Sequence, residues 1–363
     1  MNKKETKKEN TKSVNAVDEV FKKKYKFSTI VKDALKSSYK SLIFIAILFL
    51  ILTYPVPYYV FTSGGITDLS ERFEIEGDSF QQKGSYNLSY VLQRNGNVLT
   101  YVLSHFINDW ELVEKEKYQI SSDESFEEML IRDKLSLTQA NQTALYVAYS
   151  KAGKEPVIND TSYYVAATYD VLTSSEKIKI GDKLLKIEDV LVKDFEDVSN
   201  VIDSKSDGDY VKLTLERDGK EIETKVRINE SNDVKIIGIM FYRILNLDVN
   251  PNIKFLFSDS ESGSSAGLMT TLAIYDALIE EDLTHGLKIA GTGTISIDGT
   301  VGEIGGVRYK VAGAENGGAS IFLVPSGENY EEAIKVKKER NYKIEIVEIK
   351  TFDDAVNYLK ELN

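Results

Sequence analysis

The residues best suited to chemistry lie in two short stretches near the C-terminal end of the chain. The first runs from Asp259 to Gly267 with the sequence DSESGSSAG, and its last serine, Ser265, directly precedes a predicted helix. Small residues keep a hydroxyl at such a strand-to-helix turn accessible, and free backbone N–H groups at a helix start can stabilise an oxyanion. Serine and glycine are also common cap and loop residues, so this stretch alone leaves both interpretations open.

The second stretch surrounds Lys310, after a paired-glycine turn at 305–306. On the predicted helix, Lys310 lies beside an apolar face made of Val307, Val311 and Ala314. Burial lowers the pKa of a lysine, and a lysine needs a lowered pKa before it can accept a proton from serine near neutral pH. The alternative is that Lys310 reaches solvent along its aliphatic stem, as helical lysines commonly do.

The amino-acid composition argues against other catalytic groups and against nucleic-acid binding. The chain has 363 residues, no cysteine and only two histidines, His105 and His285, which lie far apart and in no recognisable motif. These counts exclude a thiolate nucleophile and give little support to a Ser-His-Asp triad or a histidine-based metal site. The net charge of −12 argues against nucleic-acid binding, which needs a basic surface.

Charge and hydropathy divide the N-terminal part. Residues 1–40 hold twelve lysines against five acidic residues, so they carry +7 and the remainder −19. The twenty residues from Leu42 to Phe61 carry no charge, which matches the roughly 20 residues that cross a bilayer as a helix. A cleaved signal peptide is the closest alternative, but about forty residues precede this run and no clear cleavage site follows it. By the positive-inside rule, we expect the lysine-rich end in the cytoplasm and residues from about 62 onward outside.

Near the end of this uncharged run, two prolines suggest that the regular helix stops, and three tyrosines stand where an aromatic belt would lie: Pro55, Pro57, Tyr54, Tyr58 and Tyr59. Further along, Asn95-Gly96 predicts a β-hairpin between SYNLSYVLQ and NVLTYVLSHF. The periodicity from Ser125 to Tyr149 predicts a long helix.

The remaining sequence contains two regions with different secondary-structure patterns. Residues 161–230 read as short strands with one helix around Phe195–Ile202, which predicts a compact, mostly-β module. From about 231 to 363 strands and helices alternate, which predicts an α/β domain. The fold class is therefore α/β (α+β) and multidomain. The expected divisions are a lysine-rich cytoplasmic segment (1–40), a transmembrane helix (41–61), a part that packs with the C-terminal domain (62–160), the mostly-β module (161–230) and the C-terminal domain (231–363).

The two chemical stretches and the sequence between them match one family. GSSAGLMTTLAIYDAL followed by IAGTGTISIDGTVGEIGGVRYKVAGAENGGASIFLVP resembles the proteolytic domain of Lon, and more closely the membrane-anchored PDZ-Lon peptidases of Gram-positive bacteria. IGDKLLKIEDVLVKDFEDVSNVI resembles the middle of a PDZ domain. The resemblance implies that Ser265, which precedes Ala-Gly, is the nucleophile and that Lys310, four residues after the second glycine, is the base. It places the family's threonine on Thr292, where it helps to orient the dyad.

The resemblance also implies a mechanism and supporting residues. Neutral Lys310 would take the Ser265 proton as Oγ attacks a peptide carbonyl, and backbone N–H groups nearby would hold the oxyanion. Gly263, Ser264 and Ala266 are the supporting residues of this turn; Ser264 stands where the family usually carries proline. No metal or organic cofactor is expected, and without a Walker sequence no AAA+ motor is expected either.

The predicted function is thus an ATP-independent, single-pass membrane serine endopeptidase that cleaves extracellular peptides or flexible protein segments. Its predicted partners are a peptide or protein substrate and the membrane, with the oligomeric state left open. The alternative is a catalytically inert PDZ-bearing binding or scaffold protein at the cell surface.

Overall fold

The structure is a computed structural model that describes residues 27–77, 82–107, 109–119, 124–169, 178–279 and 281–362. The first 26 residues of the predicted lysine-rich segment therefore lie outside the described residues, as do residues 170–177 of the predicted mostly-β module.

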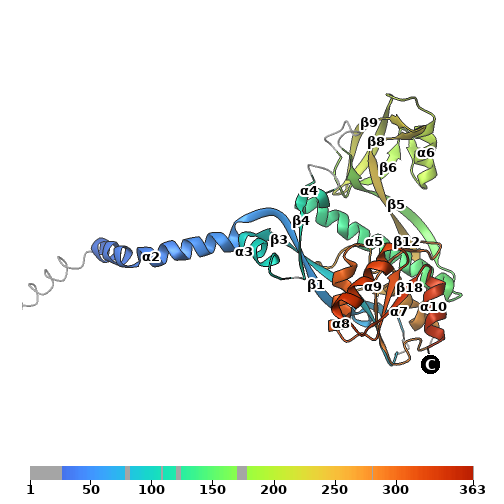
Figure 1. Cartoon of the computed structure of the whole chain (residues 1–363). Helices are drawn as coiled ribbons and strands as arrows, with labels where there is room; N and C mark the ends of the chain where they lie inside the picture. The colour runs from blue at the N-terminus through green and yellow to red at the C-terminus, as the bar shows by residue number, and fades with distance from the viewer. Residues whose placement is uncertain are drawn as a thin grey trace, which may run out of the picture.

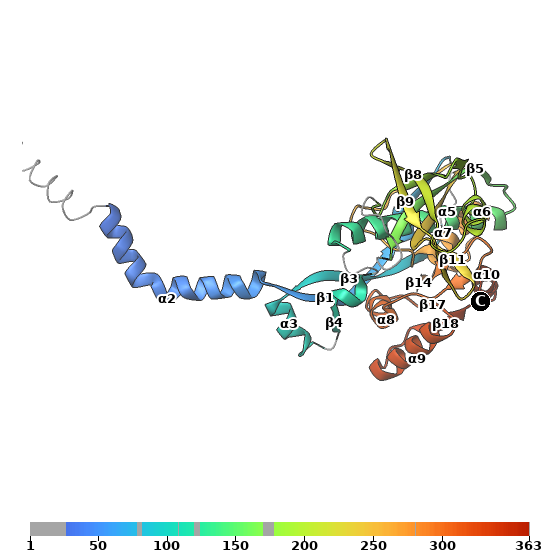
Figure 2. The same cartoon turned by 90° about the horizontal axis from the view of Figure 1, so that it is seen from above.

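Helix α2, Phe27–Thr53, extends away from a folded body, as Figures 1 and 2 show. Within it, Lys36–Thr53 is long and apolar enough to cross a membrane, and none of this window is buried against the protein. The predicted transmembrane helix of 41–61 is wrong in its last part, because strand β1 begins at Pro55. Proline fixes φ and has no N–H group to continue the helix. Tyr59, which was expected in an aromatic belt, is 2% exposed and belongs to the core of the body.

A six-stranded mixed sheet forms the centre of the body, in the order β18-β17-β14-β3-β1-β4. Strands β3, β14, β17 and β18 run parallel to one another, whereas β1 pairs antiparallel with both β3 and β4. The bounds of these strands are β1 Pro55–Asp68, β3 Ser85–Asn97, β4 Trp110–Glu114, β14 Lys288–Gly291, β17 Ile321–Pro325 and β18 Glu345–Ile349. A sheet with parallel strands and covering helices confirms the α/β class.

Helices pack on this sheet around two buried apolar clusters. They are α5 Phe126–Lys151, α7 Gly267–Ile279, α8 Val307–Asn316, α9 Glu328–Arg340 and α10 Phe352–Lys360. Helix α5 confirms the helix predicted for Ser125–Tyr149 and starts with a capping box between Ser125 and Glu128. Residues 62–160, predicted to pack with the C-terminal domain, also supply part of β1 and all of β3 to its sheet.

A second sheet, in the order β12-β5-β6-β8-β9, forms the β-rich module with helix α6, and Figure 1 shows it as a separate lobe. Its apolar core is distinct from those of the main body. Strand β12 lies in the stretch predicted to open the C-terminal domain, yet it pairs along its length with β5. The bounds are β5 Val157–Thr168, β6 Lys183–Ile187, β7 Val190–Leu191, α6 Phe195–Asp203, β8 Tyr210–Arg217, β9 Lys220–Arg227 and β12 Ile239–Asp248.

The predicted hairpin at Asn95-Gly96 is wrong. Both residues lie within β3, opposite β1, and the chain then enters helix α3, Val98–Ser104. The reason is a capping box in which the Asn97 side chain accepts from the Thr100 amide and Thr100 accepts from Asn97 N. The remaining elements are short: η1 Leu69–Glu71, β2 Phe73–Ile75, α4 Lys115–Tyr118, β10 Asn229–Ser231, β11 Val234–Ile236, β13 Ile253–Phe255, β15 Thr294–Ile295 and β16 Val301–Gly302.

Candidate active site

Ser265 lies in the loop between β13 and α7 and is half-buried. The helix begins two residues later at Gly267, where the backbone approaches β15 so closely that a Cβ would lie 2.8 Å from Ile295 N. The Ser265 carbonyl accepts two hydrogen bonds, from Gly293 N at 3.0 Å and from Thr292 Oγ1 at 3.2 Å. The backbone of the candidate nucleophile is therefore fixed to the segment that follows β14.

The preceding loop is held by contacts from distant parts of the chain. Gly263 N donates to Asp133 O of α5 at 2.9 Å, and Arg72 Nε donates to Glu261 Oε1 at 2.8 Å. Burial opposes ionisation of Glu261, but hydrogen bonds from Ser258 and Arg72 outweigh it and lower the pKa of this carboxyl group. The ionised Glu261 side chain thus connects the loop before Ser265 to Arg72, the residue that follows η1.

Lys310 lies in the first turn of α8, which begins after Gly306. That glycine has φ 72°, in the left-handed region that favours glycine over other residues. Val307 and Val311 are fully buried on the same helix, and Lys310 itself is 4% exposed. Burial lowers the pKa of Lys310 to about 7, since the low-dielectric surroundings disfavour the ammonium form. The alternative that Lys310 reaches solvent is wrong.

Thr292 connects the lysine to the serine. It follows β14, is fully buried, and is fixed through its amide to Leu323 O at 3.0 Å. Lys310 Nζ donates to Thr292 Oγ1 at 3.0 Å, and the same hydroxyl donates to Ser265 O. Within the described residues, Ser265 Oγ and Lys310 Nζ share no direct hydrogen bond. The structure therefore brings the three predicted residues together, with Thr292 as the link between the other two.

The supporting residues of the serine turn differ in their backbone hydrogen bonds. Gly263 N bonds to α5, and the Ser264 carbonyl accepts from Gly267 N at 3.1 Å. The Ala266 carbonyl accepts from Thr270 N as the helix begins. In the described part of the chain, the amides of Ser265 and Ala266 donate to no protein acceptor. Two adjacent free amides at the start of a helix are the donors that an oxyanion requires.

Two serines of the main sheet, outside every motif of the sequence, also position this site. Ser89 Oγ of β3 donates to Lys310 O at 2.7 Å, and Ser63 Oγ of β1 donates to Tyr309 O at 3.1 Å. These two hydrogen bonds fasten the first turn of α8 to the main sheet. No local signal marks the two serines, because their partners lie more than 200 residues away in the chain.

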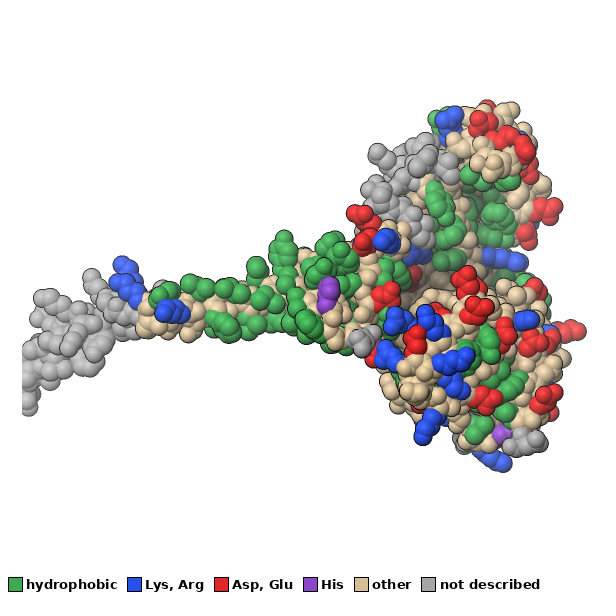
Figure 3. All heavy atoms as spheres, in the orientation of Figure 1, with side chains coloured by type: hydrophobic (Ala, Val, Ile, Leu, Met, Phe, Trp, Pro, Cys, Tyr) green, Lys and Arg blue, Asp and Glu red, His purple; other side chains and the backbone are tan. Residues whose placement is uncertain are grey.

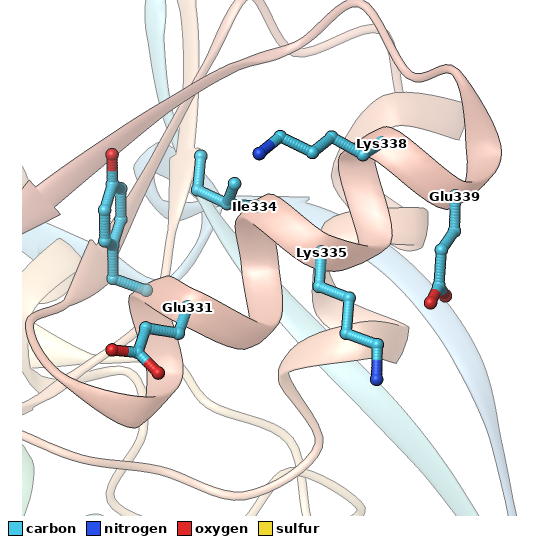
Figure 4. Close-up of a pocket in the computed structure, with 6 residues that line it drawn as sticks. Glu331, Ile334, Lys335, Lys338 and Glu339 are labelled. Atoms are coloured by element: carbon cyan, nitrogen blue, oxygen red, sulfur yellow. The ribbon is translucent and has the colours of Figure 1, made fainter.

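A pocket on the outer surface of the body is separate from these residues. Figure 4 shows that the side chains labelled there all come from α9, and none of the candidate site residues lines this pocket. Its lining mixes two lysines with two glutamates and two apolar side chains: Tyr330, Glu331, Ile334, Lys335, Lys338 and Glu339. The candidate site residues lie instead at the junction of α7, α8 and the end of β14.

These groups are suited to acyl transfer: the Ser265 hydroxyl, the buried Lys310 amine with a pKa of about 7, and the backbone amides of Ser265 and Ala266. The amine can accept the hydroxyl proton, the oxygen can attack a carbonyl, and the amides can hold the resulting anion. The hydrogen bond to Thr292 uses one N–H of the amine, so its lone pair points away from Thr292.

Comparison with known proteins agrees with this set. Residues 259–361 match the family model of the Lon protease (S16) C-terminal proteolytic domain, and residues 167–228 match that of the PDZ domain. The predicted resemblance and the mixed α/β fold class are confirmed for these two regions.

Curated relatives share the proteolytic region. A Lon protease of Malacoplasma penetrans is 38% identical over 27% of this chain, and an archaeal Lon protease of Methanothermobacter thermautotrophicus is 30% identical over 32% of it. The matches span only 12% and 17% of those proteins. A solved PDZ domain of the SdrC-like protein from Listeria monocytogenes covers 23% of this chain and 90% of its own, at 23% identity and a TM-score of 0.21. The homologues of the proteolytic domain support a serine peptidase.

Proposed function

We propose that this chain, which carries a Lon-type proteolytic domain and a PDZ domain, is an ATP-independent serine endopeptidase anchored to a membrane. Ser265 is the nucleophile and Lys310 the general base. The observation that carries the proposal is the environment of Lys310. Its amine is buried, has a pKa of about 7 and is hydrogen-bonded to Thr292, whose hydroxyl in turn holds the Ser265 carbonyl.

In the first half of the reaction, neutral Lys310 accepts the Ser265 hydroxyl proton while Oγ forms a bond to the substrate carbonyl carbon. Substrate binding must bring Oγ and Nζ within hydrogen-bond distance, as commonly happens when a catalytic hydrogen bond is long or absent in the free enzyme. The tetrahedral oxyanion lies at the amides of Ser265 and Ala266. When it collapses, the C–N bond breaks and the leaving amine takes the proton from Lys310.

In the second half, a water molecule attacks the acyl-enzyme ester. Lys310, again neutral, accepts the water proton and returns it to Ser265 Oγ as the acid product leaves. Thr292 is a positioning residue in both halves, since it orients the amine without contacting the substrate.

Helix α2 supplies the anchor in this proposal. Its window Lys36–Thr53 exposes large apolar side chains from Leu42 to Leu52, which water disfavours and a bilayer accommodates. The lysine-rich end then lies in the cytoplasm and the peptidase outside. Because the sequence has no cysteine, single-cysteine variants test this directly: an impermeant maleimide should label Lys335→Cys but not Thr11→Cys in intact cells. The reverse pattern would contradict the orientation.

The proposed substrates are peptides and flexible segments of extracellular proteins. A chain without its own motor can cleave only what already fits an extended conformation, and the PDZ domain is suited to binding extended peptide by strand addition. The proposed mechanism uses only side chains and backbone amides of this chain.

The test is cleavage of an unfolded protein substrate, such as a casein, by the purified full chain in detergent. Ser265→Ala and Lys310→Ala should each lower kcat by at least about 10³-fold, because each removes a reacting group. Ser262→Ala is the matched control, since it removes an exposed serine of the same loop, and it should keep the wild-type rate. Wild-type cleavage by Ser265→Ala would refute the proposed nucleophile.

A further inference from the structure

Residues 98–107, here called the apolar tip, form an exposed apolar surface at the end of α2. The tip comprises α3 and the three residues after it, and its sequence VLTYVLSHFI contains no Asp, Glu, Lys or Arg. No residue of α3 is buried; Val102 is 48% exposed and Phe106 is 78% exposed. Figure 3 shows hydrophobic side chains continuing from α2 onto this part of the molecule, with charged side chains gathered beyond it on the body.

Hydrogen bonds place the tip directly at the end of α2. Asn97 Nδ2, at the start of α3, donates to Leu52 O at 2.7 Å, and Val98 N donates to Tyr54 O at 3.3 Å. The last carbonyls of a helix have no partner within it, so the first bond gives one of them, Leu52 O, a hydrogen-bond partner, and the second bond joins the residue after α2 to the start of α3. At about 1.5 Å per residue, α3 is roughly 10 Å long. The whole tip therefore lies close to the point where α2 would leave the hydrocarbon layer.

The tip is also fastened to the body. The Tyr101 ring packs against the Tyr58 ring of β1 with centroids 5.5 Å apart. Strand β4, which follows the tip, and Asp109 directly before it are tied to the peptidase helices by two side-chain contacts of 2.6 Å. They join Glu111 to Tyr309 of α8, and Asp109 to Arg340 of α9. The tip cannot move far from α2 or from α8 without breaking these contacts.

We propose that the apolar tip inserts into the lipid–water interface beside the membrane-spanning helix, so that the membrane holds the peptidase at two places. This inference rests on the proposed anchoring by α2. A short helix without charged side chains can lie in the interface, where water still reaches its unpaired backbone groups, and exposed aromatic side chains such as Tyr54 and Tyr101 are suited to it. A lipid surface is the occupant because α2 already brings it to the tip.

The second attachment fixes the orientation of the body. A single helix allows the body to tilt and rotate about its connection, whereas a tip tied through β4 to α8 holds the candidate site at a set height and angle. Substrates would then approach Ser265 from a fixed direction relative to the membrane.

The experiment measures depth in the bilayer with the full chain in phosphatidylcholine–phosphatidylglycerol vesicles. Since the native sequence has no cysteine, Val102→Cys and Phe106→Cys each carry one environment-sensitive fluorophore. Lipids with a nitroxide near the headgroup should quench both labels by about twofold, as expected for a group at the interface. Leu48→Cys in α2 reports the anchor and should be quenched by nitroxides placed deep in the acyl chains.

Tyr210→Cys is the matched control, because Tyr210 is an exposed aromatic residue of β8 in the PDZ lobe, away from α2. Its label should not be quenched. If Leu48 is quenched while both tip labels behave like Tyr210, the tip proposal is overturned and the anchor stands. If Leu48 is not quenched either, the anchor fails as well. Tip labels that report an apolar environment without lipid quenching would mean that protein covers the tip, which also overturns the proposal.

Discussion

The lysine side of the candidate site lies in the core of the body, whereas the serine side lies on a half-exposed loop. Lys310 and Thr292 are buried, and their positions follow from the packing of α8 and the end of β14 on the main sheet. Ser265 is bonded through its carbonyl to the same segment after β14, but the loop before it is held by the bond from Gly263 to α5 and by the ion pair between Arg72 and Glu261. The pKa of the proposed base is therefore set by the fold, while the placement of the proposed nucleophile is set by a few polar contacts.

The largest expected effect comes from replacing the buried amine. Lys310→Met should lose activity by at least about 10³-fold and should raise the free energy of unfolding near pH 7 by on the order of 2–4 kcal/mol. The reason is that burial holds the folded-state pKa near 7, below the unfolded value of 10.5. The unfolded wild-type chain therefore binds more protons between pH 7 and 10.5, and wild-type stability rises with pH across that window.

Chemical denaturation in detergent at several pH values measures this difference. Lys310→Met should lack the part of the pH dependence that the buried lysine contributes. Lys335→Met, which removes an exposed lysine of α9, should keep the wild-type pH dependence. An identical pH dependence in wild type and Lys310→Met would contradict a buried lysine with a lowered pKa.

A smaller loss of activity is expected at Thr292, which links Lys310 to Ser265. Thr292→Val removes the acceptor of the Lys310 hydrogen bond and the donor to Ser265 O, and it should lower kcat/KM by about 10- to 100-fold. In the wild type, kcat/KM should rise with pH through about 7 as Lys310 becomes neutral. The variant should shift this midpoint to lower pH, because the buried ammonium loses an acceptor.

Thr292→Ser is the control for this prediction, since it keeps the hydroxyl and should restore both the rate and the midpoint. A Thr292→Val chain whose rate falls while the midpoint stays in place would assign Thr292 a purely structural role.

The smallest effect is expected on the serine side. Glu261→Gln weakens the ion pair with Arg72, in which both side chains are 22% exposed. Loss of this partly buried, charge-assisted hydrogen bond should lower the free energy of unfolding by about 1–2 kcal/mol, while kcat/KM falls by about threefold as the loop loosens. Glu71→Gln is the matched control, because Glu71 is 71% exposed and lies 3.7 Å from the same arginine. Equal rates in Glu261→Gln and wild type would show that the loop needs no such tie.

Local sequence patterns predicted the parts of this protein that local physics controls. The apolar periodicity of α5, the paired glycines before α8 and the small residues around Ser265 each act over a few residues, so the helices and turns that they indicate formed as expected. The exact end of α2 depended on Pro55, which the sequence marked, but the predicted span continued past it.

Tertiary structure decided what depends on distant partners. The segment after Asn95-Gly96 became α3 because Asn97 caps it and bonds to the end of α2, and residues before the PDZ domain entered the sheet of the peptidase. Lys310 looked the same in sequence whether buried or exposed. Its bond to Thr292 joins residues 18 apart, and the support from Ser89 comes from a strand 221 residues away. Both contacts, and the burial itself, arise only when the main sheet packs against α8, because desolvation is a property of the assembled core.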